Sequence, residues 1–514
     1  MMGRKYDPQP FGVKAQLPLI LFVLFLLTPC FPLHAQAPLD DGRVMLQGFY
    51  WESHRYGHPD RFPQFGTKHW YEIVRADAAD IQRGRFDLVW LPPPCYAGDN
   101  SAGYNPKQYF NLNNDYGTFA QQRALLTTLR QDGAEPVADI VINHRDGTGG
   151  WTDFKNPDWG LWSICADDEA FSNPASSAFN TPLALRGAPE EAPTPYGADK
   201  TTYAYPDFRD IDHTNRQVRR DILRYLLELK SAGYRGWRYD MVHGYHARWV
   251  ALYNKRTQPT FSVGEYDWSK EGEQRGWSWW TATKPGDLGT SSAVFDFTTM
   301  FRLKDSKGNY GAWYGQGNGL GLMGDTTDGV AWKQRAVTFL ENHDTGYRTQ
   351  DNGLPQPDHG FDSFANTWEV EQGYAYILTH PGVPCVYWKH YFEWGADLHD
   401  KIRALINARK VAGVNAGSAL NTQDNARRKG IYAARVQGKS GALYVRIGGS
   451  DADWQPSDSG YTGTREYAVG ASWKVWVALS GNPPVRQAAL PAALPAPPPY
   501  QSGDTIQVPD AWLD

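Results

Sequence analysis

Residues 236–240 read Gly-Trp-Arg-Tyr-Asp and continue as Met-Val-His-Gly-Tyr as far as Tyr245. A segment with apolar residues at helical spacing precedes this stretch, and Gly233 ends that expected helix. Arg238 and Asp240 are two residues apart, so they share one face of a short expected strand. Because burying an unpaired charge is costly, this pattern predicts either a structural ion pair or a functional site.

Two further expected strands also lead into acidic residues. The run 260–264 (Thr-Phe-Ser-Val-Gly) precedes Glu265, and the run 336–340 (Ala-Val-Thr-Phe-Leu) is followed closely by His343 and Asp344. Helix-length segments separate the three strands, so we expect their carboxyl ends at one face of a parallel sheet. In a (β/α)8 barrel, this face carries the catalytic residues.

Eight segments of the chain have the length and composition of buried strands, and helical periodicity fills most of the gaps between them. These segments are 44–51, 86–91, 137–143, 236–240, 261–265, 293–297, 336–340 and 384–388. Strands that alternate with helices indicate an α/β fold, and eight of them predict a (β/α)8, or TIM, barrel.

A motif at the third expected strand adds to the acidic strand ends. It reads Asp139-Ile-Val-Ile-Asn143-His144, and the whole set resembles the α-amylase family of glycoside hydrolases, glycoside hydrolase family 13. The resemblance extends from Leu46 to about Trp476. It implies the barrel fold already expected from the strand pattern and an enzyme that acts on α-1,4-glucans.

Different segments of the chain are similar to different members of that family. Residues 46–51 (Leu-Gln-Gly-Phe-Tyr-Trp) and 210–213 (Asp-Ile-Asp-His) are similar to plant α-amylases. Residues 337–347 and 372–379 are similar to bacterial maltotetraose-forming amylases. The first likeness favours cutting within the glucan chain, and the second favours release of short products from its ends. We expect a short maltooligosaccharide product, with maltotetraose as the first candidate.

Hydrolysis of a glycosidic bond needs a carboxylic acid that protonates the leaving oxygen and a second carboxylate that attacks or activates water. The resemblance implies that Asp240 is the nucleophile and that Glu265 is the acid/base. It also implies that Asp344 binds and distorts the sugar at the cleavage subsite. Because a nearby guanidinium favours the charged form of a carboxylate, we expect Arg238 to hold Asp240 ionised.

Three more residues are implied to bind the same sugar. His144 and His343 would donate hydrogen bonds to it, and Tyr104, in the loop after the second strand, would stack against it. Taken singly, each of the three fits a structural role as well as a functional one. Their occurrence together with three carboxylates in matching motifs favours the functional interpretation.

The connection after the third strand is far longer than the roughly two to six residues of a usual βα loop. The resemblance implies that this segment is the protruding domain B, which closes one side of the substrate cleft. It also implies a structural calcium ion between domain B and the barrel, since calcium takes about six to eight oxygen ligands. The implied ligands are the side chains of Asn143, Asp199 and Asp210 and the backbone carbonyl of Gly244. A turn or helix-cap role is the alternative for Asp210.

The start of the chain is typical of a secretory signal. Basic residues precede an apolar block at 17–33, and Ala-Gln-Ala follows at 35–37. An uncleaved membrane anchor is the alternative, but Pro29 and Pro32 interrupt the apolar block, which is short for a membrane span. We expect residues 1–37 to be a signal peptide and the protein to be secreted or periplasmic, without stable membrane association after processing.

The helical pattern gives way to short β runs with turn residues between them after about residue 414. The expected domains are therefore the barrel at 38–144 and 211–413, domain B at 145–210, an antiparallel β domain at 414–480, and a Pro/Ala-rich tail at 481–514. The composition of the tail indicates a linker rather than a packed unit.

Charge and cysteine content narrow the range of partners. The net charge of -5 argues against a nucleic-acid partner. We expect a starch or maltooligosaccharide substrate and a monomeric protein. Cys95, Cys165 and Cys385 follow the signal segment and allow at most one internal disulfide, with Cys385 expected as a buried free thiol.

Two other functions use the same sequence features. A transglycosylase of the same family would pass the sugar to another sugar instead of to water, and the motifs do not distinguish the two reactions. A non-catalytic relative that binds glucan or a partner protein would be expected to have lost a catalytic carboxylate. Asp240, Glu265 and Asp344 are all present, which disfavours that function.

Overall fold

The computed structural model describes residues 38–189, 208–266, 271–315, 319–349, 355–356, 366–457, 465–479 and 506–514. The predicted signal peptide 1–37 lies outside the described residues, as does most of the predicted tail. Within the described part of the chain, no helix is long and apolar enough to cross a membrane.

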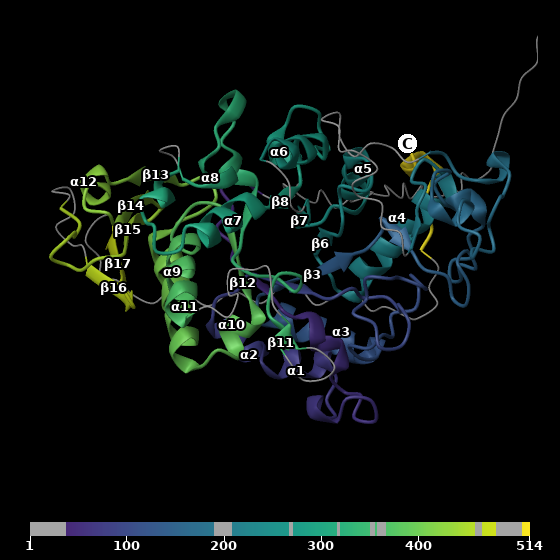
Figure 1. Cartoon of the computed structure of the whole chain (residues 1–514), viewed down its shortest axis with the longest axis horizontal. Coiled ribbons are helices and arrows are strands. Elements are labelled where there is room, and N and C mark those ends of the chain that lie inside the picture. Colours follow the sequence, from purple (N-terminus) through teal and green to yellow (C-terminus); the bar gives the residue numbers. More distant parts are fainter. Residues whose placement is uncertain are drawn as a thin grey trace, which may run out of the picture. The chain divides into compact units, whose positions relative to one another are not determined.

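Eight parallel strands form a closed barrel (Figure 1). In order around the barrel they are β1 (Met45–Gln47), β2 (Leu88–Leu91), β3 (Glu135–Ile140), β6 (Gly236–Tyr239), β7 (Phe261–Gly264), β8 (Ala293–Phe295), β9 (Ala336–Thr338) and β12 (Val383–Tyr387), which pairs with β1. Each strand overlaps one of the eight expected segments, so the predicted (β/α)8 barrel is confirmed. Nearly all strand residues are buried, as expected where helices cover a parallel sheet.

Helices follow the strands along the chain. They are α1 (Trp70–Ala76), α2 (Ala78–Arg83), α3 (Phe119–Gln131), α4 (Arg216–Ala232), α5 (Ala247–Thr257), α6 (Glu271–Trp280), α7 (Phe297–Asp305), α8 (Gly321–Gly324), α9 (Thr367–Ile377), α10 (Trp388–Phe392) and α11 (Ala396–Ala412). Helix α4 shows how individual residues fix where a helix begins and ends. The Asn215 side chain caps its first turn by accepting from the Gln217 amide, and Gly233 ends it with a φ of 132°.

The long connection between β3 and α4 leaves the barrel and returns through a short antiparallel ladder. Strand β4 (His144–Arg145) pairs with β5 (Arg209–Asp210), which places His144 opposite Asp210. The described residues between these strands form turns and short 3-10 helices. The ladder therefore brings the far end of the protruding segment back to the carboxyl end of β3.

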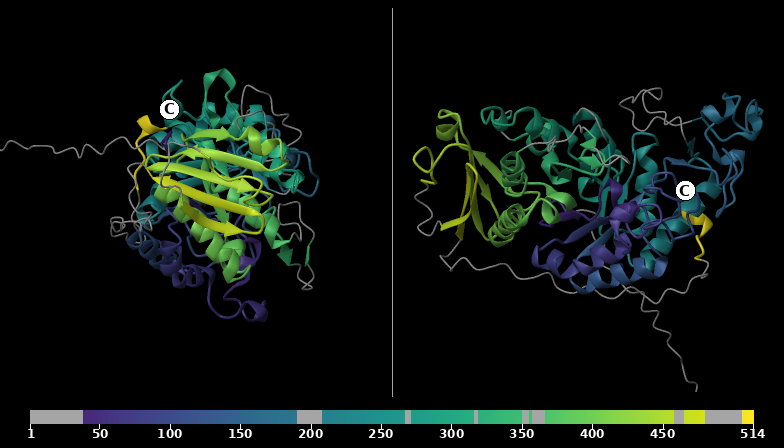
Figure 2. Two further views of the ribbon diagram at one scale, coloured as in Figure 1. Left: turned by 90° about the vertical axis from the view of Figure 1, so that its left-hand side faces the viewer. Right: turned by 60° about the horizontal axis from the view of Figure 1, so that its bottom comes forward.

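The chain after α11 forms a five-stranded antiparallel sheet, shown in the left-hand view of Figure 2. Its strands are β13 (Ala419–Thr422), β14 (Tyr432–Gln437), β15 (Gly441–Ile447), β16 (Arg465–Gly470) and β17 (Trp473–Leu479), in the order β13-β14-β15-β17-β16; α12 (Asp424–Arg427) lies between β13 and β14. Glu371 of α9 joins the sheet to the barrel helices, since its carboxylate accepts from the indole nitrogen of Trp473 at 3.0 Å and from Lys401 of α11 at 2.7 Å.

The structure shows the state of the three cysteines and corrects the interpretation of the end of the tail. Cys95, Cys165 and Cys385 are all buried, and no disulfide joins any two of them. The described residues 506–514, in the stretch interpreted as a linker or tail, pack against α4 and α5, where Leu513 is fully buried. The segment packs because its apolar anchor is buried and its acidic residues pair with arginines on the two helices. Composition alone does not record such contacts between distant parts of the chain.

Candidate active site

The guanidinium of Arg238 is the centre of a cluster of carboxylates at the carboxyl ends of the barrel strands. Its Nη1 donates to Asp139 Oδ1 at 2.8 Å and to Asp240 Oδ1 at 2.5 Å. Its Nη2 lies 2.9 Å from Glu265 Oε2. The Arg238 side chain is completely buried, so this one cation faces three carboxylates from three strand ends in the absence of bulk water.

Strand register explains why these residues meet. In the barrel, Asp139 of β3 pairs with Arg238 of β6, so their side chains lie next to each other on the same face of the sheet. Tyr239 pairs with Gly264 of β7, and Asp240 and Glu265 are the next residues on their respective strands. Parallel pairing therefore places the two expected catalytic carboxylates side by side where the strands end.

The backbone after β6 turns sharply to complete this arrangement. Met241 has a φ of 43°, in the left-handed region that residues with a side chain rarely adopt. In this conformation its N–H donates to Glu265 Oε2 at 3.2 Å. The strained turn thus supplies a hydrogen bond to the same carboxylate oxygen that lies near Arg238.

Burial raises the pKa of Asp240 well above its ordinary value, and the negative charges of Glu265 and Asp139 raise it further. Arg238 lowers this pKa, as expected from the sequence, but its effect is smaller than the sum of the others. The direction of the effect of Arg238 is as predicted, and the prediction that Arg238 holds Asp240 ionised for the reaction stays a prediction. One guanidinium cannot neutralise three buried carboxylates, so the cluster retains a proton at a pH where exposed carboxyls have lost theirs.

Asp344 lies after β9 and is held by two basic side chains. His343 Nε2 is 3.0 Å from Asp344 Oδ2, and Arg348 of the short strand β10 (Arg348–Thr349) donates to Asp344 Oδ1 at 3.0 Å. Strand β10 pairs with β11 (Pro355–Gln356). Enclosure by the protein raises the pKa of Asp344, but His343, Arg348 and Arg238 together bring it below its ordinary value. Asp344 is therefore an anion next to the cluster that retains a proton.

Flat rings line the space beside the carboxylates. The Tyr104 ring is nearly parallel to the His343 ring, with centroids 4.9 Å apart, and the Trp51 ring is parallel to Tyr104 at 6.0 Å. The Tyr104 hydroxyl donates to Asp139 Oδ2 at 2.8 Å, which ties the ring to the carboxylate cluster. Parallel aromatic faces of this kind suit the flat C–H faces of sugar rings.

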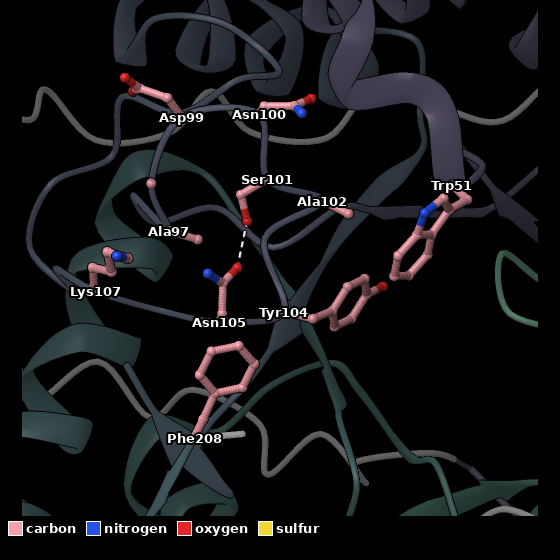
Figure 3. A pocket seen from close by; sticks show the side chains of 11 residues that line it. Trp51, Ala97, Asp99, Asn100, Ser101, Ala102, Tyr104, Asn105, Lys107 and Phe208 are labelled. Atoms are coloured by element: carbon pink, nitrogen blue, oxygen red, sulfur yellow. Dashed lines mark hydrogen bonds between the residues drawn. The ribbon is translucent and has the colours of Figure 1, made fainter. Parts of the chain in front are cut away.

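A cavity of about 380 Å³ continues from Tyr104 (Figure 3). Trp51, Tyr104 and Phe208 provide its aromatic surfaces, and polar side chains complete the lining. The polar side chains are Asp99, Asn100, Ser101, Asn105 and Lys107. The mixture of apolar rings and hydrogen-bonding groups is typical of a site for a small polar ligand.

His144 is placed differently from the expectation of a free hydrogen-bond donor. Its Nε2 bonds to the Tyr104 carbonyl at 2.7 Å, and its Nδ1 is 3.3 Å from the Asn143 amide. Burial lowers the pKa of His144 to about 4, so the ring is neutral. A hydrogen bond from His144 to a sugar stays a prediction, and it requires one of these partners to be exchanged.

Several residues at the site had no role in the sequence interpretation. The sequence could have identified Asp139 as a site residue, because an acidic residue inside an otherwise apolar strand needs a partner. Trp51 lies in a segment noted only for its resemblance. Phe208 and Arg348 gave no signal, because both lie in connections between barrel strands whose positions depend on the folded chain.

Three of the four expected calcium ligands lie together. Asn143 Oδ1 is buried and accepts no hydrogen bond in the part of the chain that the structure describes. The Asn143 amide nitrogen is 3.5 Å from Asp210 Oδ1, and a Cβ added to Gly244 would lie 1.9 Å from Asn143 Oδ1. The fourth expected ligand, Asp199, lies outside the described residues. An unpartnered oxygen next to a carboxylate and a closely approaching backbone fits a hard cation.

A second group of acidic residues adjoins this one. Asp168, Glu169 and Asp210 present carboxylate oxygens within 4.8 Å of one another. Arg209 already pairs with Asp168 at 2.9 Å and with Glu169 at 2.6 Å. Asp210 is therefore the member of this group that also lies beside Asn143.

Comparison with known proteins gives independent evidence on which family this chain resembles. Residues 81–266 match the family model described as "Alpha amylase, catalytic domain", and residues 411–477 match "Alpha-amylase C-terminal beta-sheet domain". The "Probable alpha-amylase 2" of Arabidopsis thaliana is 34% identical over 446 residues, which cover 82% of this chain and 92% of that protein. The "Glucan 1,4-alpha-maltotetraohydrolase" of Stutzerimonas stutzeri is 30% identical over 460 residues, covering 85% and 74%.

Solved structures show the same fold. An α-amylase from Geobacillus thermoleovorans, solved with acarbose, superposes with a TM-score of 0.59 at 13% identity. The superposition covers 86% of this chain and 99% of that chain.

Replacing Arg238 with Met should leave three buried carboxylates without their cation. We expect a loss of about 3–5 kcal/mol in the free energy of unfolding at pH 8, measured by urea denaturation. The loss should shrink as the pH falls, because carboxyls whose pKa is raised in the folded state take up protons and then need no counter-ion. The control Arg403→Met removes an exposed partner of Asp400 and should cost less than about 1 kcal/mol. Equal losses in both variants, or a loss at Arg238 that does not change with pH, would contradict this account.

Proposed function

Because the chain belongs to the α-amylase family, we propose that it is a retaining glycoside hydrolase that cleaves α-1,4-glucosidic bonds of starch or related glucans. The observation that carries the proposal is the contact of one buried guanidinium with both Asp240 and Glu265. A shared guanidinium favours the short carboxylate separation of a retaining pair over the wider separation that admits a water molecule.

In the proposed mechanism, Glu265 protonates the leaving oxygen while Asp240 attacks the anomeric carbon and forms a glycosyl-enzyme. Glu265 then takes a proton from water, which releases the sugar with its original configuration. The raised pKa of Asp240 indicates that the buried carboxylates share a proton, and the division of roles requires that this proton lies on Glu265 when the sugar is bound. As the leaving oxygen takes up this proton, Asp240 is free to act as an anion beside Arg238.

The sugar at the cleavage point would lie between the carboxylates and the aromatic rings. Tyr104 offers a ring face, and the anionic Asp344 can accept hydrogen bonds from sugar hydroxyls. Positive charge develops on the sugar in the transition state, and the carboxylates around it stabilise that charge better than they stabilise the substrate. Further glucose units would extend into the cavity lined by Trp51 and Phe208.

The transglycosylase is the second candidate, since it uses the same carboxylates and differs only in the acceptor. The names of the two relatives described above favour hydrolysis. For the product, the likeness to a maltotetraohydrolase supports a short oligosaccharide with maltotetraose first. The likeness to the Arabidopsis protein supports the competing action within the glucan chain.

A calcium ion is proposed at the junction of the protruding segment and the barrel. Asn143, Asp210 and the backbone of Gly244 would hold it, with Asp199 as an additional ligand expected from the sequence. The ion would supply a fixed positive charge that links these oxygens. Secretion, which the amino-terminal sequence supports, and a monomeric state are also part of the proposal.

Asp240→Asn and Glu265→Gln should each reduce kcat on soluble starch by at least about 10³-fold, because each removes one of the two reacting groups and keeps its shape. Proton NMR of the first product formed by the wild-type enzyme should show the α anomer. The control Asp400→Asn changes an exposed carboxylate and should retain full activity. If either site variant keeps more than about a tenth of the wild-type kcat, the residue does not have the catalytic role proposed for it. A β anomer as first product would show that the enzyme inverts the anomeric configuration.

Starch whose chain ends are blocked distinguishes the two modes of action. If the enzyme works from chain ends, the blocked polymer should keep its iodine staining, while unblocked starch should give maltotetraose as the main early product in chromatography. Rapid loss of staining on the blocked polymer would show internal cutting and contradict the chain-end mode. The same digestion with an added sugar acceptor detects transglycosylation as longer products.

Removal of calcium with a strong chelator should lower the thermal midpoint, because the Asn143 and Asp210 oxygens would lose the cation that links the protruding segment to the barrel. Added Ca²⁺ should restore it, and added K⁺ should not. The variant Asn143→Ala should be insensitive to both treatments. A midpoint that ignores the chelator and added Ca²⁺ alike in the wild-type protein would count against the site.

A further inference from the structure

The described residues 508–514 form a short segment that lies on helices α4 and α5. It contains the 3-10 helix Asp510–Trp512, followed by Leu513, whose side chain is completely buried. Val508 and Trp512 pack against the main hydrophobic core as well. An apolar anchor of this kind indicates a docked peptide rather than a chain lying loosely on the surface.

Four arginines on α4 and α5 receive this segment, and we call them the arginine face: Arg216, Arg219, Arg220 and Arg256. Arg216 bonds to the Asp514 carboxylate at 2.6 Å, and Arg220 bonds to the Asp510 carboxylate. The two acidic side chains of the segment therefore both meet cations. Charge on the two surfaces is complementary from one end of the segment to the other.

Arginines of the same face also bind the backbone of the segment. Arg219 Nε donates to the Leu513 carbonyl at 2.8 Å, and Arg256 Nε donates to the Trp512 carbonyl at 3.0 Å. Arg256 Nη2 adds bonds to the carbonyls of Ala511 at 2.9 Å and Asp514 at 3.0 Å. Fixed guanidinium donors that bind successive carbonyls define one orientation of the peptide, which scattered surface ion pairs do not.

The contact continues from the arginine face towards the active site. Besides Leu513, Arg219 binds the carbonyls of His213 at 2.9 Å and Thr214 at 2.6 Å, at the point where the protruding segment enters α4. His213 in turn bonds through Nε2 to the Ile142 carbonyl at 2.9 Å. Ile142 precedes Asn143, so Arg219 and His213 together link the docked segment to the residues just after β3.

We propose that the arginine face is a peptide-docking site whose occupant is the chain's own segment 508–514, and that docking fixes the base of the protruding segment against the barrel. This inference is independent of the proposed function, because it concerns a surface outside the carboxylate cluster.

Full-length variants test the docking from both sides. Leu513→Asp places a charge in the buried anchor, and Arg256→Ala removes three of the backbone contacts. Each should lower the thermal midpoint by about 2–4 °C. The double variant should lower it little further, because both changes break the same contact. The control Lys255→Ala removes the neighbouring cation of α5, which has no contact with the segment in the described part of the chain, and should leave the midpoint unchanged.

Hydrogen exchange locates the effect. Leu513→Asp should speed amide exchange in α4, α5 and residues 208–214, and leave strands β14–β17 at the wild-type rate. A synthetic peptide of residues 506–514 should restore the midpoint of Leu513→Asp. It should not restore that of Arg256→Ala, and a scrambled peptide should restore neither.

Three results would overturn the proposal. Unchanged midpoints and exchange rates in both variants would show that the segment does not dock. Strictly additive effects would show that Leu513 and Arg256 act separately. A wild-type midpoint that rises with protein concentration, together with a dimer that Leu513→Asp dissociates, would show that the segment docks on a second copy. None of these measurements depends on glucan hydrolysis. The docking proposal can therefore be tested even if the proposed hydrolase function is wrong.

Discussion

The buried guanidinium of Arg238 is the constraint on which the rest of the structure depends. Three carboxylates reach it from β3, β6 and β7, and such charges are tolerated away from water only when they are paired. The pairing works only in the observed strand register, because a slip of one residue would turn Arg238 away from Asp139. The barrel therefore serves to hold one cation and its partners at fixed positions.

The same arrangement explains why carboxyl groups in one site differ in pKa. Asp240 shares a single cation with two other carboxylates, and its pKa is raised. Asp344 faces His343 and Arg348, and its pKa is lowered. Loss of contact with water raises the pKa of both groups, and the separation follows because the nearby positive groups outweigh this effect only at Asp344. In the proposed mechanism, Glu265 carries the proton that the cluster holds, Asp240 attacks as an anion, and the anionic Asp344 binds the sugar.

Segments outside the barrel strands complete the site and support it. The β4–β5 ladder returns Asp210 to His144 and Asn143, and Phe208 reaches the cavity from the same return. Arg219 links residue His213, just before α4, to the docked residues 508–514, and His213 in turn bonds to the Ile142 carbonyl just after β3. The protruding segment is thus fixed from the barrel side and from the far end of the chain. Leu513 adds an apolar anchor to these polar supports, which satisfy backbone groups that loops leave without partners.

Apolar periodicity and acidic strand ends are local properties, so the amino-acid sequence predicted the eight barrel strands, the β domain and the grouping of Asp240, Glu265 and Asp344. The folded structure added that Asp139 joins them, that the pKa of Asp240 is raised, and that His144 bonds to Tyr104. It also decided that residues 508–514 pack. These outcomes depend on the balance of charges and on contacts between residues far apart in the chain, which no local pattern records.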